Sequence, residues 1–175
     1  MTERADKTAS KHQQAHVRNV VCATPEMVAS HIADARLLRL LRDWDGWRAG
    51  RSLPARGDFR PEGLQYLLGH LFLLDILPGP DGPRFRYRLF GSAVTVYRGF
   101  DLTGQFLDQH PDPAFAARAH LAYLQAVQAR LPLWASVAGI TADGLSANFE
   151  GLILPLAGDG ESPDMVLSAQ IMTPA

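Results

Sequence analysis

Apolar residues recur at two different spacings along this chain, one typical of helices and one typical of strands. Over residues 24–50, and again over 112–132, they return every three or four positions, which predicts two amphipathic helices. Pro25 and Pro113 stand in the first turn of these segments, where proline fits a helix. The apolar stripe of the first helix is wide, so we expect the rest of the domain or a second copy of the chain to cover it.

Five other segments have the pattern of strands. Residues 70–77 are apolar on both faces, which predicts a covered central strand. In the next segment Phe85, Tyr87 and Leu89 alternate with arginines, which predicts a strand with one buried face, joined to the first strand as a hairpin. Three more strands are expected over residues 133–141, 147–156 and 165–172.

The order of these elements indicates the fold class. A short helix opens at Pro61, and short helical elements lie between Gly91 and Gly99. Strands and helices do not alternate, so the pattern disfavours a doubly wound parallel sheet and favours an α+β domain. Residues 19–23 fit either an extra strand or the lead-in to the first helix.

The composition is that of an ordinary globular domain. Of the 175 residues, 47% are hydrophobic and 20% are charged, which suits one domain over residues 19–175. Residues 1–18 are polar and lack apolar periodicity, which predicts a disordered tail. A formal net charge of −1 favours neither nucleic acid nor a membrane surface as partner. With the single cysteine Cys22 and no secretory or membrane-spanning pattern, we expect a cytoplasmic protein.

Two motifs give the sequence a resemblance to a known family. One contains Leu53, Pro54, Arg56, Asp58 and Pro61, and the other contains Tyr87, Arg88, Leu89, Gly91, Gly99, Asp101, Leu102, Thr103 and Gly104. Over roughly residues 37–172 they resemble the signature stretches of a bacterial family of small single-domain PAS proteins. Arg60 and Phe100 depart from that pattern, where an acidic and a basic residue are more usual.

The resemblance implies a PAS-like fold, with a five-stranded antiparallel sheet, an N-terminal helix, and helices on one face. It also implies a small cavity between the strand that ends at Phe90 and the helices that follow it. The aromatic residues that we expect to line this cavity are Phe72, Tyr87, Phe90, Tyr97, Phe106, Phe115, Tyr123, Trp134 and Phe149. Tyr97 and Tyr123 are favoured, because a buried hydroxyl group needs a partner.

Several motif residues are expected to shape turns instead of binding a ligand. They are Arg56, Asp58, Gly91, Gly99, Asp101, Thr103 and Gly104. The first two glycines would permit sharp backbone changes, and Asp101 and Thr103 would bond nearby N–H groups. Arg56 and Asp58 would form a local ion pair, with a partner-binding loop as the alternative.

A stripe of arginines on the second strand has two interpretations. Arg84, Arg86 and Arg88 would pair with Asp75 and Glu150 on neighbouring strands, or would face an acidic partner or a cyclic dinucleotide.

The resemblance implies a stand-alone sensory or signalling module that acts by protein–protein interaction. A small ligand in the cavity would bias that interaction by preferring one of two states. We expect a homodimer through the N-terminal helix and the outer face of the sheet, and a further protein partner that the sequence does not identify. No catalytic constellation and no set of metal ligands is predicted.

The sequence is also compatible with two alternative functions. A cone-shaped α+β enzyme resembling steroid isomerases would use Asp75 or Asp101 as general base, near Tyr97 or Tyr123. A haem- or flavin-loaded sensor would need an iron ligand or a flavin site. His70, His110 and His120 are the candidate haem ligands, and Cys22 lacks the sequence context of flavin-binding light sensors.

Overall fold

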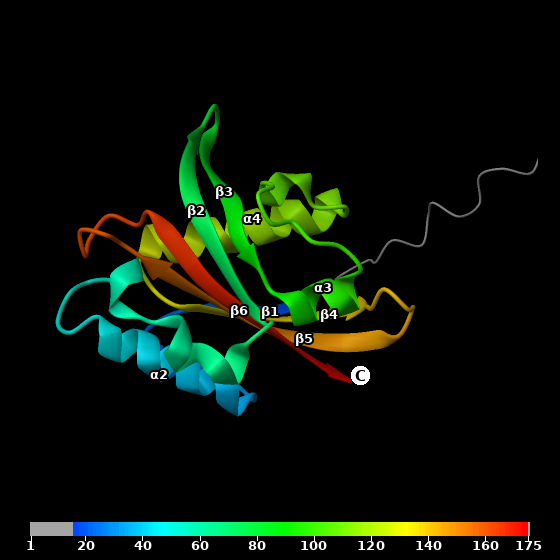
Figure 1. Cartoon of the computed structure of the whole chain (residues 1–175), viewed down its shortest axis with the longest axis horizontal. Coiled ribbons are helices and arrows are strands. Elements are labelled where there is room, and N and C mark those ends of the chain that lie inside the picture. Colours follow the sequence, from blue (N-terminus) through cyan, green and yellow to red (C-terminus); the bar gives the residue numbers. More distant parts are fainter. Residues whose placement is uncertain (1–15, 175) are drawn as a thin grey trace, which may run out of the picture.

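The computed structural model describes residues 16–174, which form one antiparallel sheet with helices packed against it (Figure 1). The six strands lie in the order β1-β4-β5-β6-β2-β3. Their bounds are β1 (His16–Cys22), β2 (Leu71–Gly79), β3 (Gly82–Phe90), β4 (Leu133–Ile140), β5 (Ser146–Leu156) and β6 (Met165–Pro174). The α+β class is therefore confirmed, with one strand more than the five predicted.

The additional strand is β1, an edge strand that pairs with β4. It includes the stretch 19–23 that fitted either a strand or a helix lead-in, up to Cys22. It also takes residues 16–18 from the predicted tail, and the remainder of that tail lies outside the described residues. The segment can be a strand here because β4 supplies its hydrogen bonds, while Val21 packs against one core and Val17 against the other.

The helical elements are four α-helices and three short 3₁₀ segments within the described residues. They are α1 (Pro25–Ala29), α2 (Ala35–Trp47), η1 (Arg56–Asp58), η2 (Pro61–Leu67), α3 (Ser92–Arg98), η3 (Leu107–Gln109) and α4 (Pro113–Ala129). None of the helices in this part of the chain is long and apolar enough to cross a membrane.

The single helix predicted over residues 24–50 was wrong, because the chain breaks between α1 and α2. Asp34 is the N-cap of α2, and its Oδ1 accepts a hydrogen bond from the backbone N–H of Arg36 at 2.8 Å. The N–H groups of Ala33 and Asp34 point away from the helix and donate to the carboxylate of Glu150 on β5, at 2.7 and 3.0 Å. These side-chain acceptors compete with the helical hydrogen bonds and end α1.

The two faces of the sheet carry separate cores. Helix α2 covers one face, and Leu37, Leu40, Leu41 and Trp44 bury its apolar stripe against the sheet of the same chain. The indole Nε1–H of Trp44 donates to the carbonyl of Pro155 on β5 at 2.9 Å, which fixes the helix in place. Helices α3 and α4 cover the opposite face with a second apolar cluster (Figure 1).

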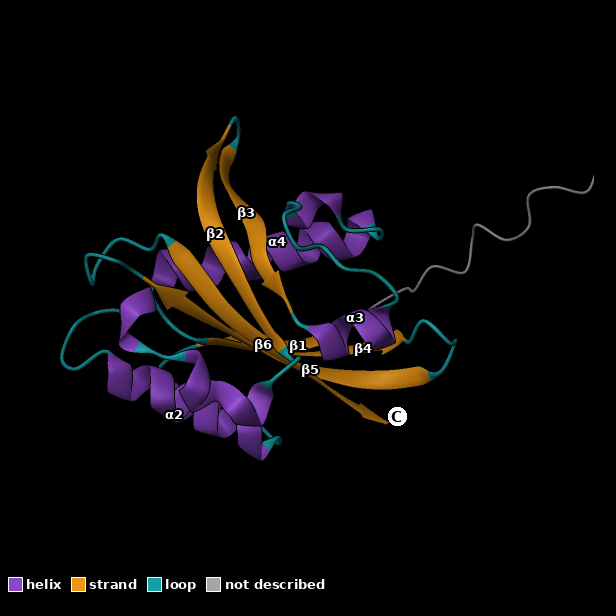
Figure 2. Ribbon diagram, viewed as in Figure 1, coloured by secondary structure: helices purple, strands orange, loops and turns teal. Residues whose placement is uncertain are grey.

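The β2–β3 hairpin extends beyond its neighbours at its tip (Figure 2) and contains one irregularity. The pairing shifts by one residue between Leu73 and Leu74, where a β-bulge interrupts the alternation of β3. Phe85 and Tyr87 face the core as predicted, but Leu89 is 47% exposed and Phe90 is buried in its place. The prediction that Leu89 shares the buried face was therefore wrong.

Candidate ligand-binding site

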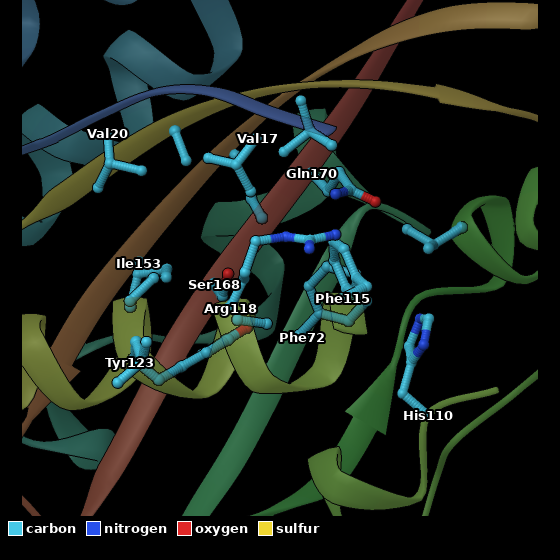
Figure 3. Close-up of a pocket in the computed structure, with 18 of the residues that line it drawn as sticks. Val17, Val20, Phe72, His110, Phe115, Arg118, Tyr123, Ile153, Ser168 and Gln170 are labelled. Atoms are coloured by element: carbon cyan, nitrogen blue, oxygen red, sulfur yellow. The ribbon is translucent and has the colours of Figure 1, made fainter. Parts of the chain in front are cut away.

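A cavity of about 320 Å³ lies between the sheet and the helices α3 and α4 (Figure 3). All six strands reach its wall, from Val17 and Val20 on the edge strand β1 to Phe90 on β3. A second hollow of about 640 Å³ lies between the hairpin tip and the far side of α4. The first is the better candidate site, because buried aromatic and aliphatic side chains form most of its wall.

Three aromatic rings form one end of the cavity. Phe72 lies 5.8 Å from Tyr87 and 4.9 Å from Phe90, measured between ring centroids, and Tyr87 lies 5.2 Å from Phe90. The rings meet at steep angles, an arrangement that aromatic pairs favour. Small residues of α4 and the sheet, such as Ala122, Ala135 and Gly151, leave the space that these rings do not fill.

The structure places five of the nine predicted aromatic residues in the cavity wall. They are Phe72, Tyr87, Phe90, Phe115 and Tyr123. The other four do not line it, and the alternation of the strands explains one of them. Trp134 points to the opposite face of the sheet, where it donates to Glu150 at 2.7 Å and stacks on His31.

The remaining three predicted aromatics have other contacts. Phe106 lies outside the cavity, under the guanidinium of Arg84, which is 3.7 Å from its ring centroid. Tyr97 and Phe149 pack against each other at 5.4 Å, in the layer behind Arg98. They therefore support the cavity wall without forming it.

Arg98 is a buried polar residue of the cavity that was not predicted from the sequence. It is the last residue of α3, only 5% exposed, and its guanidinium lies 4.1 Å from the ring centroid of Phe149. Its Nη2 donates to Oε1 of Gln170 on β6 at 3.0 Å. Burial lowers the pKa of this guanidinium, and the neighbouring hydroxyls of Tyr97 and Tyr87 act in the opposite direction.

Gln170 connects Arg98 to the sheet. Its backbone carbonyl accepts from the hydroxyl of Tyr97 at 3.3 Å, and its backbone N–H donates to the carbonyl of His70 at 3.0 Å. Figure 3 shows its side chain at the cavity, with Arg118 extending from α4 towards it. Gln170 therefore orients the donors of Arg98 at the cavity wall.

Two tyrosine hydroxyls belong to the same wall. Burial raises the pKa of Tyr87 well above its ordinary value, and no described residue provides a hydrogen-bond partner for its hydroxyl. Burial also raises the pKa of Tyr123 to about 12, and a hydrogen bond with Ser168 opposes the shift. Both phenols are thus neutral at physiological pH and can donate a hydrogen bond.

His110 also lines the cavity, between the rings of Phe100 and Phe115. Its Nδ1 lies 2.9 Å from the backbone nitrogen and 3.2 Å from the carbonyl oxygen of Asp112, so it accepts from the N–H in one tautomer and donates to the carbonyl in the other. Burial lowers its pKa to about 4, and it is therefore uncharged at neutral pH. Its Nε2 is accordingly a hydrogen-bond donor in the first tautomer and an acceptor in the second.

The other candidate haem and flavin residues lie outside the cavity wall. His120 packs on Phe85, at 5.3 Å between ring centroids, and His70 bonds the backbone of Gln170. Cys22 is half-buried at the end of β1, and burial raises the pKa of its thiol. No group of three metal-ligating side chains is found among residues 16–174.

The two aspartates of the isomerase alternative are also elsewhere. Asp75 forms ion pairs with Arg86 at 2.9 Å and Arg88 at 2.8 Å. Asp101 is exposed in a turn and accepts the N–H of Thr103 at 2.8 Å. Neither carboxylate lines the cavity, so the structure does not provide the general base near Tyr97 or Tyr123 that this alternative needs.

The arginine stripe pairs partly as expected. Asp75 is the partner of two of the three arginines, but Glu150 is not a partner of any of them. Arg84 instead forms a bidentate pair with Asp108, at 2.8 Å for both bonds.

The turn residues hold the helix α3 against the sheet. Gly99 and Gly104 have φ angles of 79° and 82°, the left-handed region that glycine adopts without strain. Gly91 has an ordinary φ of −62°, and its need for glycine has another cause. A Cβ atom there would lie 2.2 Å from the carbonyl oxygen of Gly69, so the expected sharp backbone change is in fact a close approach of two segments.

The expected ion pair between Arg56 and Asp58 does not form. Asp58 pairs with Arg51 at 2.6 Å and accepts the N–H of Ala55. Arg56 stacks on the ring of Phe59, 4.5 Å from its centroid, because η1 turns the two side chains in different directions.

Comparison with known proteins agrees with this fold. The model of a family described as "PAS domain" matches residues 32–170, and the chain belongs to that family. A search among curated proteins found no match. Among solved structures, the chain is similar to one described as the structure of an RNA-binding light-oxygen-voltage receptor. The identity is 14% and the TM-score 0.41, over 67% of this chain and 35% of that one. The chain thus spans about a third of the length of that receptor.

Proposed function

We propose that this PAS domain is a sensory module that binds a small molecule in the cavity between the sheet and α4. The observation that supports the proposal is the cavity itself, with its volume of about 320 Å³ and its apolar wall. Protein interiors are close-packed and rarely leave such a space unfilled. The hydroxyl of Tyr87, the guanidinium of Arg98 and the imidazole of His110 supply the few polar groups that orient a ligand.

The position of the cavity suggests how binding would reach a partner protein. One wall is β1, an edge strand that pairs with β4 and leads directly into α1 and α2. The opposite wall is α4, which packs against β1. A ligand that contacts both would favour one arrangement of β1 relative to α4, and so shift the population of states that a partner protein recognises.

Native mass spectrometry of the freshly purified protein tests the proposal. We expect an excess mass that disappears under denaturing conditions. The substitution Ala122→Phe fills the cavity and should abolish the excess mass, whereas Ala129→Phe, at the exposed end of the same helix, should retain it. Excess mass that survives in the Ala122→Phe variant would place the ligand elsewhere and contradict the proposal.

We also propose that two copies of the chain associate through the N-terminal helices, in the cytoplasm. Because Leu41 is buried within its own chain, the contact would use exposed residues such as Met27 on α1. Light scattering should then give a dimer mass for the wild type and a monomer mass for Met27→Glu. A monomeric wild type would contradict this part of the proposal.

A further inference from the structure

We propose that the ligand of the cavity is a monocarboxylate with an apolar body, and that Arg98 binds its carboxylate. This inference rests on the proposed function, because it names the class of ligand for the same site. It is carried by the position of the buried positive charge of Arg98 in a mostly apolar wall.

The charge of Arg98 has no carboxylate partner among the described residues. The ion pairs of this part of the chain involve other arginines, such as Arg86 and Arg88 with Asp75. A buried charge without a counter-ion is costly to a fold, so such a residue usually indicates a missing partner. Among the residues that line the cavity there is no Asp or Glu that could become that partner by a change of rotamer.

Other contacts within the protein offset only part of the cost of burying the Arg98 charge. The ring of Phe149 covers one face of the guanidinium at 4.1 Å, and Gln170 accepts one hydrogen bond in its plane. A guanidinium has five N–H donors, all in its plane. A carboxylate can accept two of the remaining ones at once, which is the pairing that arginine geometry favours.

The neighbouring polar groups also suit an acceptor. The Tyr87 hydroxyl, which lacks a partner among the described residues, can donate a hydrogen bond, and so can the neutral imidazole of His110 in its Nε2–H tautomer. Both lie in the wall that contains Arg98. A ligand with a positive headgroup would meet the like charge of Arg98 there, so the wall favours an anion.

The rest of the wall indicates the rest of the ligand. Two arginines line the cavity, the buried Arg98 and the exposed Arg118, and the bidentate pairing of the Arg98 guanidinium with one carboxylate matches a monocarboxylate. The aromatic and aliphatic lining and the volume of about 320 Å³ fit an alkyl or aryl body. A body of about ten carbon atoms would fill it.

Calorimetric titration of the wild-type protein with decanoate and with decanol tests the inference without any substitution. The two probes have the same chain and differ in charge at about pH 8, where the carboxylate is ionised. We expect decanoate to bind at least about tenfold more tightly than decanol. Equal affinities would overturn the inference while leaving the cavity as a ligand site. Tighter binding of decyl phosphate than of decanoate would also overturn it.

Substitution of Arg98 identifies the residue responsible. In Arg98→Met the affinity for decanoate should fall to that for decanol, and Arg98→Lys should retain part of the difference. Arg42→Met, exposed on α2 and remote from the cavity wall, should bind as the wild type does. If Arg98→Met does not fold, the comparison of decanoate with decanol in the wild-type protein still tests whether the site prefers a carboxylate. If neither probe binds, the inference fails, and the native mass spectrum separately decides whether the cavity holds any ligand.

Discussion

At the scale of single residues, Glu150 on β5 joins three separate parts of the chain. Its carboxylate accepts the N–H groups of Ala33 and Asp34, between α1 and α2, and the indole N–H of Trp134 on β4. The side chain is almost fully buried, so these three donors replace the water that an exposed carboxylate would bind. Glu150 thereby anchors the N-terminal helices on the sheet.

We expect Glu150→Gln to lower the free energy of unfolding by about 2 kcal/mol, because the amide group would direct an N–H at a backbone donor. Urea unfolding of the purified variant measures the change. Glu161→Gln, in the exposed turn before β6, removes the same charge and should change the free energy by less than about 0.5 kcal/mol. Equal effects of the two substitutions would show that Glu150 has no anchoring role.

His110 should make stability depend on pH. Its pKa in the folded protein is about 4, below the ordinary value of 6.5, so the unfolded chain binds a proton in a range where the folded chain does not. The stability that neutral His110 contributes should therefore be fully present above its ordinary pKa of 6.5, and should fall as the pH decreases towards 4. At about pH 5 the loss from this residue alone should be about 2 kcal/mol relative to about pH 7.

The comparison of wild type with His110→Gln isolates this contribution, since other groups titrate in both proteins. Unfolding midpoints at the two pH values should differ less in the variant. If both proteins lose the same stability on acidification, His110 is not held neutral by burial.

At the scale of elements, α3 is held by a contact between two glycines. Gly91, the N-cap of α3, approaches Gly69 so closely that a side chain at Gly91 would meet its carbonyl at 2.2 Å. The carbonyl of Gly69 in turn accepts the N–H groups of Ala93 and Val94, at 3.0 and 3.2 Å. The turn after η2 thus caps the helix that carries Arg98.

Gly91→Ala should therefore destabilise the protein by about 2 kcal/mol, since a backbone carbonyl cannot move aside cheaply. Gly46→Ala is the matched control, because open space surrounds that position within α2. The control should raise the free energy of unfolding by up to about 1 kcal/mol through helix propensity. Thermal unfolding of both variants checks the opposite signs, and a stable Gly91→Ala variant would contradict the close contact.

The elements that the sequence predicts correctly are those whose signal is local. The periodicity of α4 and the turns of the β2–β3 hairpin lie within the segments themselves. The break between α1 and α2 could not be predicted in this way, because its cause is Glu150, more than a hundred residues away. The bulge that exposes Leu89 likewise arises in the pairing of two strands and leaves the alternation in the sequence intact.

The cavity was predictable in position more than in chemistry. The family resemblance located it, and aromatic residues such as Phe72, Tyr87 and Tyr123 could be assigned to it. Arg98 could not, because an arginine at the end of a short helix is usually exposed. The sequence contained one signal for Arg98. It directly follows the apolar residues of α3 and precedes Gly99, the left-handed C-cap that ends the helix.

At the scale of the whole molecule, the sheet separates two cores with different character. The core under α2 is tightly packed around Trp44 and its leucines, and it anchors the N-terminal helices. The core under α3 and α4 contains the cavity, and its polar groups come from elements that are far apart in sequence. The fold thus packs one face closely and leaves a cavity in the other, with β1 in contact with both.

A titration of the isotope-labelled wild-type protein with decanoate, followed by amide chemical shifts, tests most directly whether the cavity between the sheet and α4 binds a ligand. We expect the largest changes at residues that line the cavity, such as Val94, Ala122, Val137 and Ser168. Changes concentrated around the hollow beside the hairpin tip, at Asp81 or Ala117, would contradict this expectation, as would the absence of any change.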